Sequence, residues 1–138
     1  FFDQTLGTFL FKEIIKSLEF LEGNMKISKE LTVGRCGPNV RFLLENGTLE
    51  IYGSGEMKSN DDPEEDIWKE LNKEMIEMIY IEKGVTTIGN KMFNNFVKLQ
   101  SIYIPSTIET IGINPFIGCN ELSNVEIDRN VSSQDSNN

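Results

Sequence analysis

The sequence contains no histidine and only two cysteines. Without histidine, the chain lacks the commonest general base, the commonest zinc ligand and the imidazole of Ser-His and Cys-His nucleophile pairs. Cys36 and Cys119 lie far apart and form no CxxC motif, so they predict neither a metal site nor a disulfide framework. The chain also has no glycine-rich phosphate loop and no nucleophile elbow. We therefore expect a protein that is not an enzyme and that holds no cofactor or metal.

Basic residues are few: 13 Lys and Arg stand against 22 Asp and Glu, for a formal net charge of −9. A nucleic acid or an anionic membrane surface binds through a surface rich in Lys and Arg, so this balance argues against both partners. Hydrophobic residues make up 38% of the 138 residues and charged residues 25%, which are values typical of one globular domain. We expect an acidic globular protein that binds neither a nucleic acid nor an anionic membrane surface.

No apolar run approaches the roughly 20 residues of a membrane span, so no membrane insertion is expected in this segment. The N-terminus, Phe1-Phe2-Asp3-Gln4, lacks an initiator Met and the basic and apolar regions of a signal peptide. We expect the chain to be a segment of a longer protein, in which case this absence says little about its compartment.

Residues 78–128 repeat themselves with a shift of 23 residues. The first copy carries Ile79, Tyr80, Ile81, Val85, Thr87, Ile88, Gly89, Phe93 and Leu99. The second copy carries Ile102, Tyr103, Ile104, Ile108, Thr110, Ile111, Gly112, Phe116 and Leu122. A third copy begins with Val125 and Ile127. Self-similarity at a fixed period of this length is typical of a solenoid.

Each repeat is expected to begin with a short strand in which isoleucines point inward around an outward tyrosine. A second short strand follows at 85–88 and 108–111, and we expect Gly89 and Gly112 to close it with a positive φ. Segments 90–98 and 113–121 are too short for an ordinary helix, so we expect one helical turn in each. Stacked repeats place equivalent side chains about 4.8 Å apart and merge them into apolar columns.

Two such columns are expected, Ile79 with Ile102 and Val125, and Phe93 with Phe116. In the second repeat Cys119 takes the place of Phe96, as a small buried hydrophobe would. We expect a structural thiol, because no basic residue beside it would lower its pKa.

A β-hairpin is predicted upstream, around the turn Asn46-Gly47. The turn pairs Glu45 with Thr48. One face then carries Val40, Phe42, Leu44, Leu49 and Ile51, and the opposite face carries Arg41, Leu43, Glu45, Thr48, Glu50 and Tyr52. This asymmetry fixes the register, because a slip of one residue would send the apolar row into water.

A helix is predicted from Asp62 to Met75, with Asp62 as its N-terminal cap and Pro63 at the first helical position. Ile67, Leu71 and Met75 would form its buried stripe, with Trp68 beside it. The acidic residues at 61–66 could suggest calcium, but they lack the ligand spacing and the glycine of an EF-hand loop, which favours a solvated charge run.

The N-terminal segment predicts an amphipathic helix over residues 9–22, ended by Gly23-Asn24. Its polar face mixes both signs of charge, so packing onto the rest of the protein is favoured over a membrane surface. Residues 25–35 carry no clear pattern and are expected to be a link. The polar tail from Ser132 to Asn138 is expected to be disordered.

The second repeat resembles the unit of the BspA-like, or Treponema-type, leucine-rich repeats, L-x-x-(V/I)-x-I-P-x-x-(V/I)-x-x-I-G-x-x-(A)-F-x-x-C-x-x-L. The matching positions are Leu99, Ile102, Ile104, Pro105, Ile108, Ile111, Gly112, Phe116, Cys119 and Leu122. Upstream, Cys36-Gly37, the hairpin, Gly53-Ser54-Gly55-Glu56-Met57 and Trp68 are similar to the capping module that often precedes such arrays. The resemblance covers Cys36 to Ile127. The first repeat departs from it at Glu82 and Phe96, and the second at Pro115.

The predicted fold is therefore α/β and mainly β: a right-handed leucine-rich-repeat solenoid with 23-residue repeats and short parallel strands, capped N-terminally by a β-hairpin and helix. The expected divisions are 1–35 for the N-terminal helix and linker, 36–77 for the capping hairpin and helix, 78–128 for the repeats and 129–138 for a disordered tail. The resemblance implies a cell-surface or secreted protein whose arrays mediate adhesion to other proteins or cells without catalysis.

A protein-binding site is expected on the outward row of the first strands, at Tyr80, Tyr103, Gln100 and Glu126. Exposed aromatic side chains are enriched at binding hot spots. The alternative is that Tyr80 and Tyr103 only form a favourable cross-strand ladder, so that this segment is the purely structural capping end of a longer array. An enzyme is the third and least supported reading.

The C-terminal edge at Val125-Glu126-Ile127 has only the polar tail after it. An uncovered strand edge is prone to pair with another chain. We expect this edge to fray or to support edge-to-edge self-association.

Overall fold

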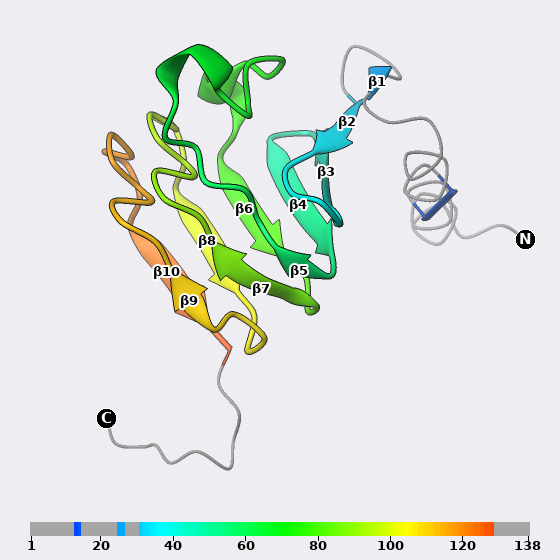
Figure 1. Ribbon diagram of the computed structural model, residues 1–138. Helices are drawn as coiled ribbons and strands as arrows, with labels where there is room; N and C mark the ends of the chain where they lie inside the picture. The colour runs from blue at the N-terminus through cyan, green and yellow to red at the C-terminus, as the bar shows by residue number, and fades with distance from the viewer. Residues whose placement is uncertain (1–12, 15–24, 27–30, 129–138) are drawn as a thin grey trace, which may run out of the picture.

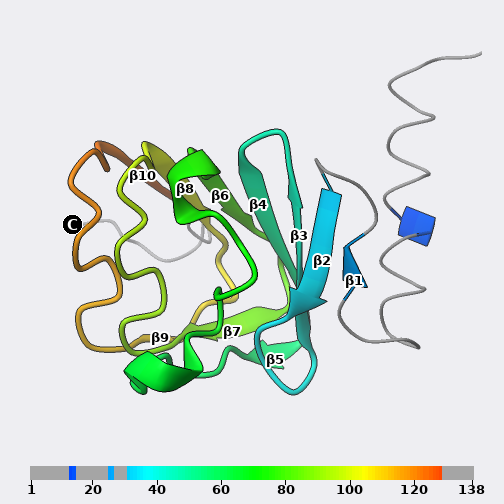
Figure 2. The ribbon, with the colours of Figure 1, turned by 90° about the horizontal axis from the view of Figure 1, so that it is seen from above.

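The computed structural model describes residues 13–14, 25–26 and 31–128. Its strands form a seven-stranded sheet in the order β1-β2-β3-β4-β6-β8-β10 and a three-stranded sheet in the order β5-β7-β9. The strands of the larger sheet are β1 Met25–Lys26, β2 Leu31–Arg35, β3 Val40–Glu45, β4 Thr48–Gly53, β6 Met78–Ile81, β8 Ser101–Ile104 and β10 Asn124–Ile127. Those of the smaller sheet are β5 Gly55–Glu56, β7 Val85–Ile88 and β9 Thr110–Ile111. The two sheets lie on opposite sides of one core, as Figures 1 and 2 show.

The parallel ladder of the larger sheet confirms the repeat. Ile79 is in register with Ile102, and Ile102 with Val125, so equivalent residues of successive copies lie side by side. Ile79 and Ile102 are buried, because the inward positions of each strand face the core between the sheets. The predicted solenoid architecture of short parallel strands is therefore present over residues 78–128.

The segments that connect the sheets contain hydrogen-bonded turns, and the single helical turns expected at 90–98 and 113–121 are not formed. Lys91 and Asn114 both have a positive φ, as do Asn95 and Gly118. Equivalent residues of the two repeats therefore share the same backbone conformation. In this turn, every second N–H group points toward the following repeat. The N–H groups of Lys91, Phe93 and Asn95 donate to the carbonyl oxygens of Ile113, Pro115 and Ile117.

The aromatic column forms as predicted. The rings of Phe93 and Phe116 stack with centroids 5.8 Å apart and planes 17° apart. Phe93 is fully buried, and Phe116, which belongs to the last complete repeat, is partly exposed. The turns therefore deliver both rings to the core without a helix.

Gly89 and Gly112 are required by close backbone approach, and the prediction of a positive φ at these positions is wrong. A Cβ on Gly89 would lie 2.6 Å from the carbonyl O of Lys58. A Cβ on Gly112 would overlap the side chain of Asn90 in the preceding repeat. The repeats stack so tightly at this corner that only glycine fits.

The hairpin forms in the predicted register around Asn46 and Gly47, whose φ angles are 52° and 80°. Both values are positive, as a type I′ turn demands. Val40 and Leu49 are fully buried on the core face. The last hairpin strand, β4, then pairs in parallel with β6, which joins the antiparallel strands to the repeats in one sheet.

The second face of the hairpin is not polar and exposed, as the alternation had suggested. Leu43 and Tyr52 are buried there, because residues 31–35 form strand β2 and bring Leu31 and Val33 beside them. The link expected at 25–35 therefore contains strands, and the sheet has an apolar cluster on each side at this end.

The helix predicted from Asp62 to Met75 is absent, and two short 3₁₀ helices, Pro63–Glu65 and Lys73–Met75, stand in its place. Asp62 does accept from the N–H of Glu64 in the first of them, in the capping role expected for it. Met75 is exposed, whereas Trp68 is completely buried in the core. Ile67 and Leu71 of the predicted stripe are partly buried and pack against the core, and Trp68 is the side chain that this segment buries completely.

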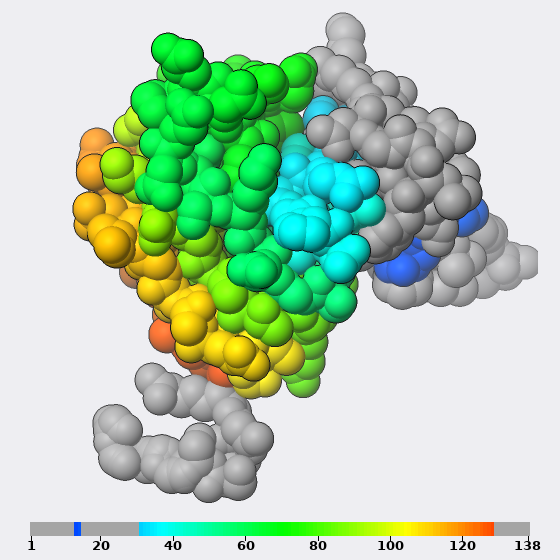
Figure 3. Space-filling view, in the orientation of Figure 1, coloured from blue at the N-terminus to red at the C-terminus, as the bar shows by residue number. Residues whose placement is uncertain are grey.

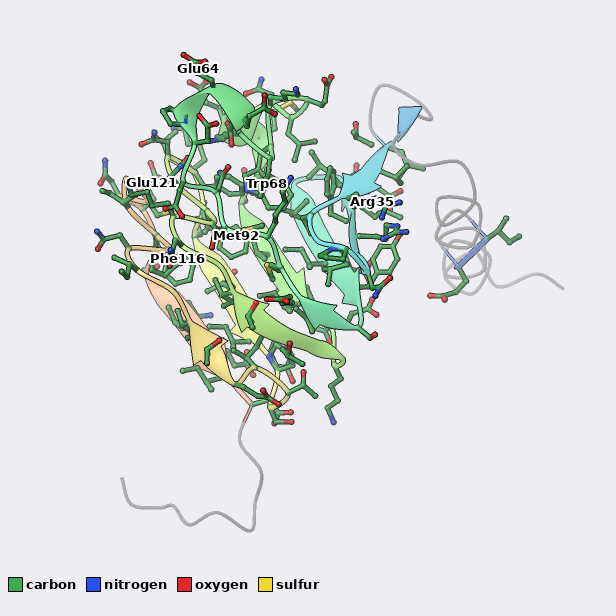
Figure 4. All side chains as sticks on the ribbon, viewed as in Figure 1. Arg35, Glu64, Trp68, Met92, Phe116 and Glu121 are labelled. Atoms are coloured by element: carbon green, nitrogen blue, oxygen red, sulfur yellow. The ribbon has the colours of Figure 1, made fainter. Side chains whose placement is uncertain are left out.

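Residues 57–77 take the place that a preceding repeat would occupy. The carbonyl oxygens of Asn90, Met92 and Asn94 are equivalent to those of Ile113, Pro115 and Ile117, which accept from the repeat before them. Asn90 O accepts from the N–H of Asn60, Met92 O from Trp68 Nε1, and Asn94 O from Lys73 Nζ. Trp68 lies beside Met92 in Figure 4.

The predicted N-terminal helix over 9–22 and the disordered tail lie outside the described residues, except for Glu13 and Ile14. These two residues are helical, and Ile14 is exposed although the amphipathic pattern placed it on the apolar face.

Candidate protein-binding surface

The outward face of β6, β8 and β10 carries side chains in straight rows, because the parallel register pairs equivalent positions. One row consists of Met78, Ser101 and Asn124. The next row consists of Tyr80, Tyr103 and Glu126, and it continues on the other side to Glu50 of β4. The hydrogen-bonded strands therefore hold these side chains in regular positions on one face of the sheet.

Tyr80 and Tyr103 stack with ring centroids 4.8 Å apart and planes 10° apart. The separation equals the spacing of neighbouring strands, as expected for identical side chains in register. Tyr80 is 39% exposed even though one face of its ring is covered by Tyr103. The pair is a flat aromatic surface open to solvent, and it is also the cross-strand ladder that the sequence indicated.

The carboxylates of Glu126 and Asp128 lie near Tyr103. The pKa of Tyr103 is raised above its ordinary value of 10.0 by partial desolvation, then by a hydrogen bond to Asp128 and by the charges of Asp128, Tyr80 and Glu126. Glu126 occupies the position after Tyr103 in the row. The raised pKa favours the protonated phenol of Tyr103.

Gln100, the remaining predicted site residue, lies just before β8, outside the tyrosine row. It belongs to an adjacent row with Glu77 and Ser123, linked through the backbone: Gln100 N–H donates to Glu77 O at 2.8 Å, and Ser123 N–H to Gln100 O at 3.1 Å. Its side chain is exposed. The structure thus brings Tyr80, Tyr103 and Glu126 together and leaves Gln100 at the margin.

Sequence reasoning missed Met78 and Asp128. Met78 is 37% exposed at the outward position two residues before Tyr80. Its row could have been read from the 23-residue shift, which aligns Met78 with Ser101 and Asn124. Asp128 follows the last strand, where no repeat position marks it.

Cys119 is held as a structural thiol. Its Sγ lies 3.0 Å from the carbonyl O of Phe93, to which it donates. Burial raises the pKa of the thiol above its ordinary value of 9.0, and the lowering effects of a hydrogen bond to the Phe96 backbone and of the Lys73 charge do not offset it. A thiol with a raised pKa is a poor nucleophile at neutral pH.

A hollow of about 490 Å³ lies between the hairpin turn and the loop at 70–77. Its lining includes Glu70, Glu74 and Glu77 but no Ser, Cys, His or Lys that could act as a nucleophile or a base with them. Within the described ranges, no group of three or more His, Cys, Asp or Glu could hold a metal ion. None of the helices in the described part of the chain is long and apolar enough to cross a membrane.

Solved structures contain a similar fold. A leucine-rich repeat protein from Eubacterium ventriosum ATCC 27560 superposes with a TM-score of 0.56 and 20% sequence identity. The match covers 67% of this chain, and the chain spans 27% of that protein. This likeness supports the leucine-rich-repeat fold and is too distant in sequence to support more.

No curated protein matches the chain. The family model described as "BspA type Leucine rich repeat region (6 copies)" matches residues 70–138, which is half of the 138 residues. The match includes both complete repeats, the stacked tyrosines and strand β10. The chain therefore belongs to the BspA-type leucine-rich repeat family.

Proposed function

We propose that the chain is a non-catalytic protein-binding module of a cell-surface or secreted adhesion protein. Leucine-rich repeats of this type point to protein interaction, and the observation that carries the proposal here is the exposed stack of Tyr80 on Tyr103. A surface or secreted location follows from the resemblance to the family alone.

The tyrosine pair has the physical properties of a contact surface. Its rings are held at 4.8 Å by the sheet, so little conformational entropy is lost when a partner covers them. Tyrosine combines a large apolar area with a hydroxyl that can form hydrogen bonds, which is why it is enriched at interfaces. Met78, which is exposed on the same face, would add to the apolar contact area.

A purely structural role is the alternative, in which residues 31–77 cap the N-terminal end of a right-handed array. The side-chain donors Trp68 and Lys73, which replace the backbone N–H groups of a missing repeat, favour a capping role for this part of the chain. Right-handedness is expected because crossover connections between parallel strands of one sheet have that hand. Capping and binding are compatible, since they use different parts of the chain.

Catalysis is not part of the proposal. Cys119 is half-buried with a raised pKa, and the sequence has no histidine to activate a nucleophile. Asp66, whose pKa is lowered, is paired with Lys73 in a structural contact.

The test is the double variant Tyr80→Ala/Tyr103→Ala, assayed against a panel of purified extracellular-matrix and cell-surface proteins. We expect the wild type to be retained by at least one member of the panel and the double variant to lose most of that binding while keeping its thermal stability. The matched control is Thr86→Ala/Glu109→Ala, which removes side chains near the smaller sheet. Equal losses of binding and stability would show that the tyrosines are structural, and retention by no panel member would favour the capping role.

A further inference from the structure

Two glutamates flank the stacked tyrosines. The register of four neighbouring strands forms one straight row on the outward face of the larger sheet, which consists of Glu50 of β4, Tyr80 of β6, Tyr103 of β8 and Glu126 of β10. The two rings cover one face of each other, so each ring turns its second face toward the neighbouring glutamate. The row therefore contains two similar places where an aromatic face lies beside a carboxylate.

The negative charge is greater on the Tyr103 side of the row. Asp128 accepts a hydrogen bond from the Tyr103 hydroxyl, and the charges of Asp128 and Glu126 both act on that phenol. Strands β4, β6, β8 and β10 contain no Lys or Arg at any position. These strands therefore supply no cation that would neutralise the two carboxylates.

The row lies on the face of the sheet and not on its edge. Side chains of a strand project perpendicular to the sheet, whereas a following repeat would add its strand in the plane of the sheet, beside β10. Such a strand would extend the row and leave its outward face open. Figure 3 is seen from the side of the smaller sheet, and the tyrosine row lies on the opposite side of the core.

An aromatic face beside a carboxylate matches the chemistry of the arginine side chain. The guanidinium group is planar, so it can stack on a tyrosine ring while its N–H groups donate to a carboxylate. A lysine ammonium carries the charge but has no plane with which to stack. An acidic side chain of a partner would be repelled by Glu126 and Asp128.

The open shape of this surface favours an arginine that belongs to a protein. A flat sheet face covers only one side of a free cation, and small ligands normally bind in cavities that surround most of their surface. An arginine of a partner protein shares its site with the rest of an interface, and arginine is enriched at the centres of such interfaces. Met78, which is 37% exposed on the same face, provides an apolar neighbour for that interface.

We propose that Tyr103, Glu126 and Asp128 form a binding site for an arginine side chain of the partner protein. The inference rests on the proposed function as a protein-binding module and names the chemistry of its partner. The guanidinium plane lies against the second face of the Tyr103 ring, and its N–H groups donate to the carboxylates of Glu126 and Asp128. Tyr80 supports the site from the other side, because its ring stacks on that of Tyr103 at 4.8 Å.

The test uses the full chain and short peptides, blocked at both ends, in which glycine alternates with arginine, lysine or citrulline. Citrulline keeps the planar end group of arginine but carries no charge, and lysine keeps the charge but not the plane. We expect the arginine peptide to shift the ring signals of Tyr103 in NMR spectra, and the ring to shift the side-chain signals of the bound arginine upfield. The lysine peptide should bind more weakly, the citrulline peptide should not bind, and added salt should weaken binding.

Two variants and a control locate the site. Glu126→Gln removes the charge of an exposed side chain and keeps its size, so it should weaken the arginine peptide by about fivefold. Tyr103→Leu keeps an apolar side chain without an aromatic face, and should weaken binding and remove the upfield shift. Glu109→Gln makes the same change at an exposed carboxylate next to the smaller sheet and should leave binding unchanged.

Equal binding of the arginine and citrulline peptides, or binding unaffected by Glu126→Gln, would overturn the proposal. So would an arginine peptide that leaves the Tyr103 signals unchanged at millimolar concentration. The proposed function is judged separately: a panel protein whose retention requires Tyr80 and Tyr103, but is unaffected by Glu126→Gln and by excess arginine peptide, would uphold the binding module and reject the arginine site.

Discussion

The indole Nε1 of Trp68 donates a hydrogen bond to the carbonyl O of Met92 at 2.6 Å, where the backbone of a preceding repeat would otherwise donate. In the next repeat the equivalent carbonyl, that of Pro115, accepts from the N–H of Phe93. One side chain thus replaces a backbone donor at the end of the array. It also fills the core, because the Trp68 ring contacts Phe42, Phe93 and Phe96.

Trp68→Phe should therefore be strongly destabilising. The variant keeps an aromatic ring but leaves the buried Met92 carbonyl without its indole donor, which costs about 1–3 kcal/mol, and the smaller ring adds a cavity cost of similar size. Urea unfolding measures the difference from wild type. Phe93→Leu removes aromatic volume from the same cluster but no side-chain donor, and should cost less. A Trp68→Phe protein within about 0.5 kcal/mol of wild type would show that the bond contributes little.

Lys73 performs the corresponding role at Asn94. Its Nζ donates to the carbonyl O of Asn94 at 3.0 Å and to its side-chain oxygen at 2.8 Å, and pairs with Asp66 at 3.0 Å. Lys73→Met keeps the aliphatic stem but removes these bonds, so we expect a loss of about 1–2 kcal/mol in the free energy of unfolding. The matched control is Lys69→Met, a change at an exposed lysine of the same segment, which should alter stability by less than about 0.5 kcal/mol. Equal effects of the two variants would contradict this role.

Much of the fold could be predicted because the sequence repeats. The 23-residue shift aligns Ile79 with Ile102 and Val125, and parallel pairing is the arrangement that brings such equivalents together. The Asn46-Gly47 turn likewise fixes the hairpin register through local backbone chemistry. The turn can be recognised from a few neighbouring residues, and the repeat can be recognised when two segments of the sequence are aligned.

The rest depends on contacts that no local pattern records. Residues 62–75 have the spacing of an amphipathic helix, but their backbone follows the carbonyl edge of the first repeat, because Trp68 and Lys73 must reach Met92 and Asn94. Strand β2 is short and contains Gly34, so its pattern is too weak to recognise without β3 beside it. Tyr80 and Tyr103 could be predicted as a pair, whereas Asp128 joins them only through the fold.

Asp66 should make the protein sensitive to acid. Burial alone would raise the pKa of its carboxyl, but hydrogen bonds from Asn60, Lys73 and the Trp68 N–H, with the Lys73 charge, outweigh burial and lower it below 3.8. A carboxyl whose pKa is lowered by folding contributes stability above its unfolded pKa, and the contribution is lost as the pH falls through the folded value.

The measurement is the free energy of unfolding as a function of pH. Asp66→Asn should reduce stability at neutral pH and flatten the decline below about pH 4, where the carboxyl of the unfolded chain begins to bind its proton. Glu64→Gln, a change at an exposed carboxyl nearby, should leave the profile as in the wild type. An unchanged slope in Asp66→Asn would mean that other groups govern the acid transition.

Tyr103 should titrate late at alkaline pH, because partial desolvation, the hydrogen bond to Asp128 and the nearby negative charges raise its pKa above 10.0. Asp128→Asn removes a hydrogen-bonded charge and should move that pKa back toward the ordinary value. Ring-carbon NMR signals of Tyr103, followed as the pH is raised, measure the shift, and Glu109→Gln serves as the control for a carboxylate elsewhere on the repeats.

The same coupling sets a limit on alkaline stability. Folding favours the protonated phenol, so this contribution is fully present below the unfolded pKa and is lost as the pH rises through the folded one. Deprotonation also places a phenolate beside Glu126 and Asp128, which repels both. The Asp128→Asn protein should therefore lose less stability than wild type above about pH 10. If the pKa of Tyr103 in the wild type is at or below the ordinary value, Asp128 does not interact with the Tyr103 hydroxyl in solution.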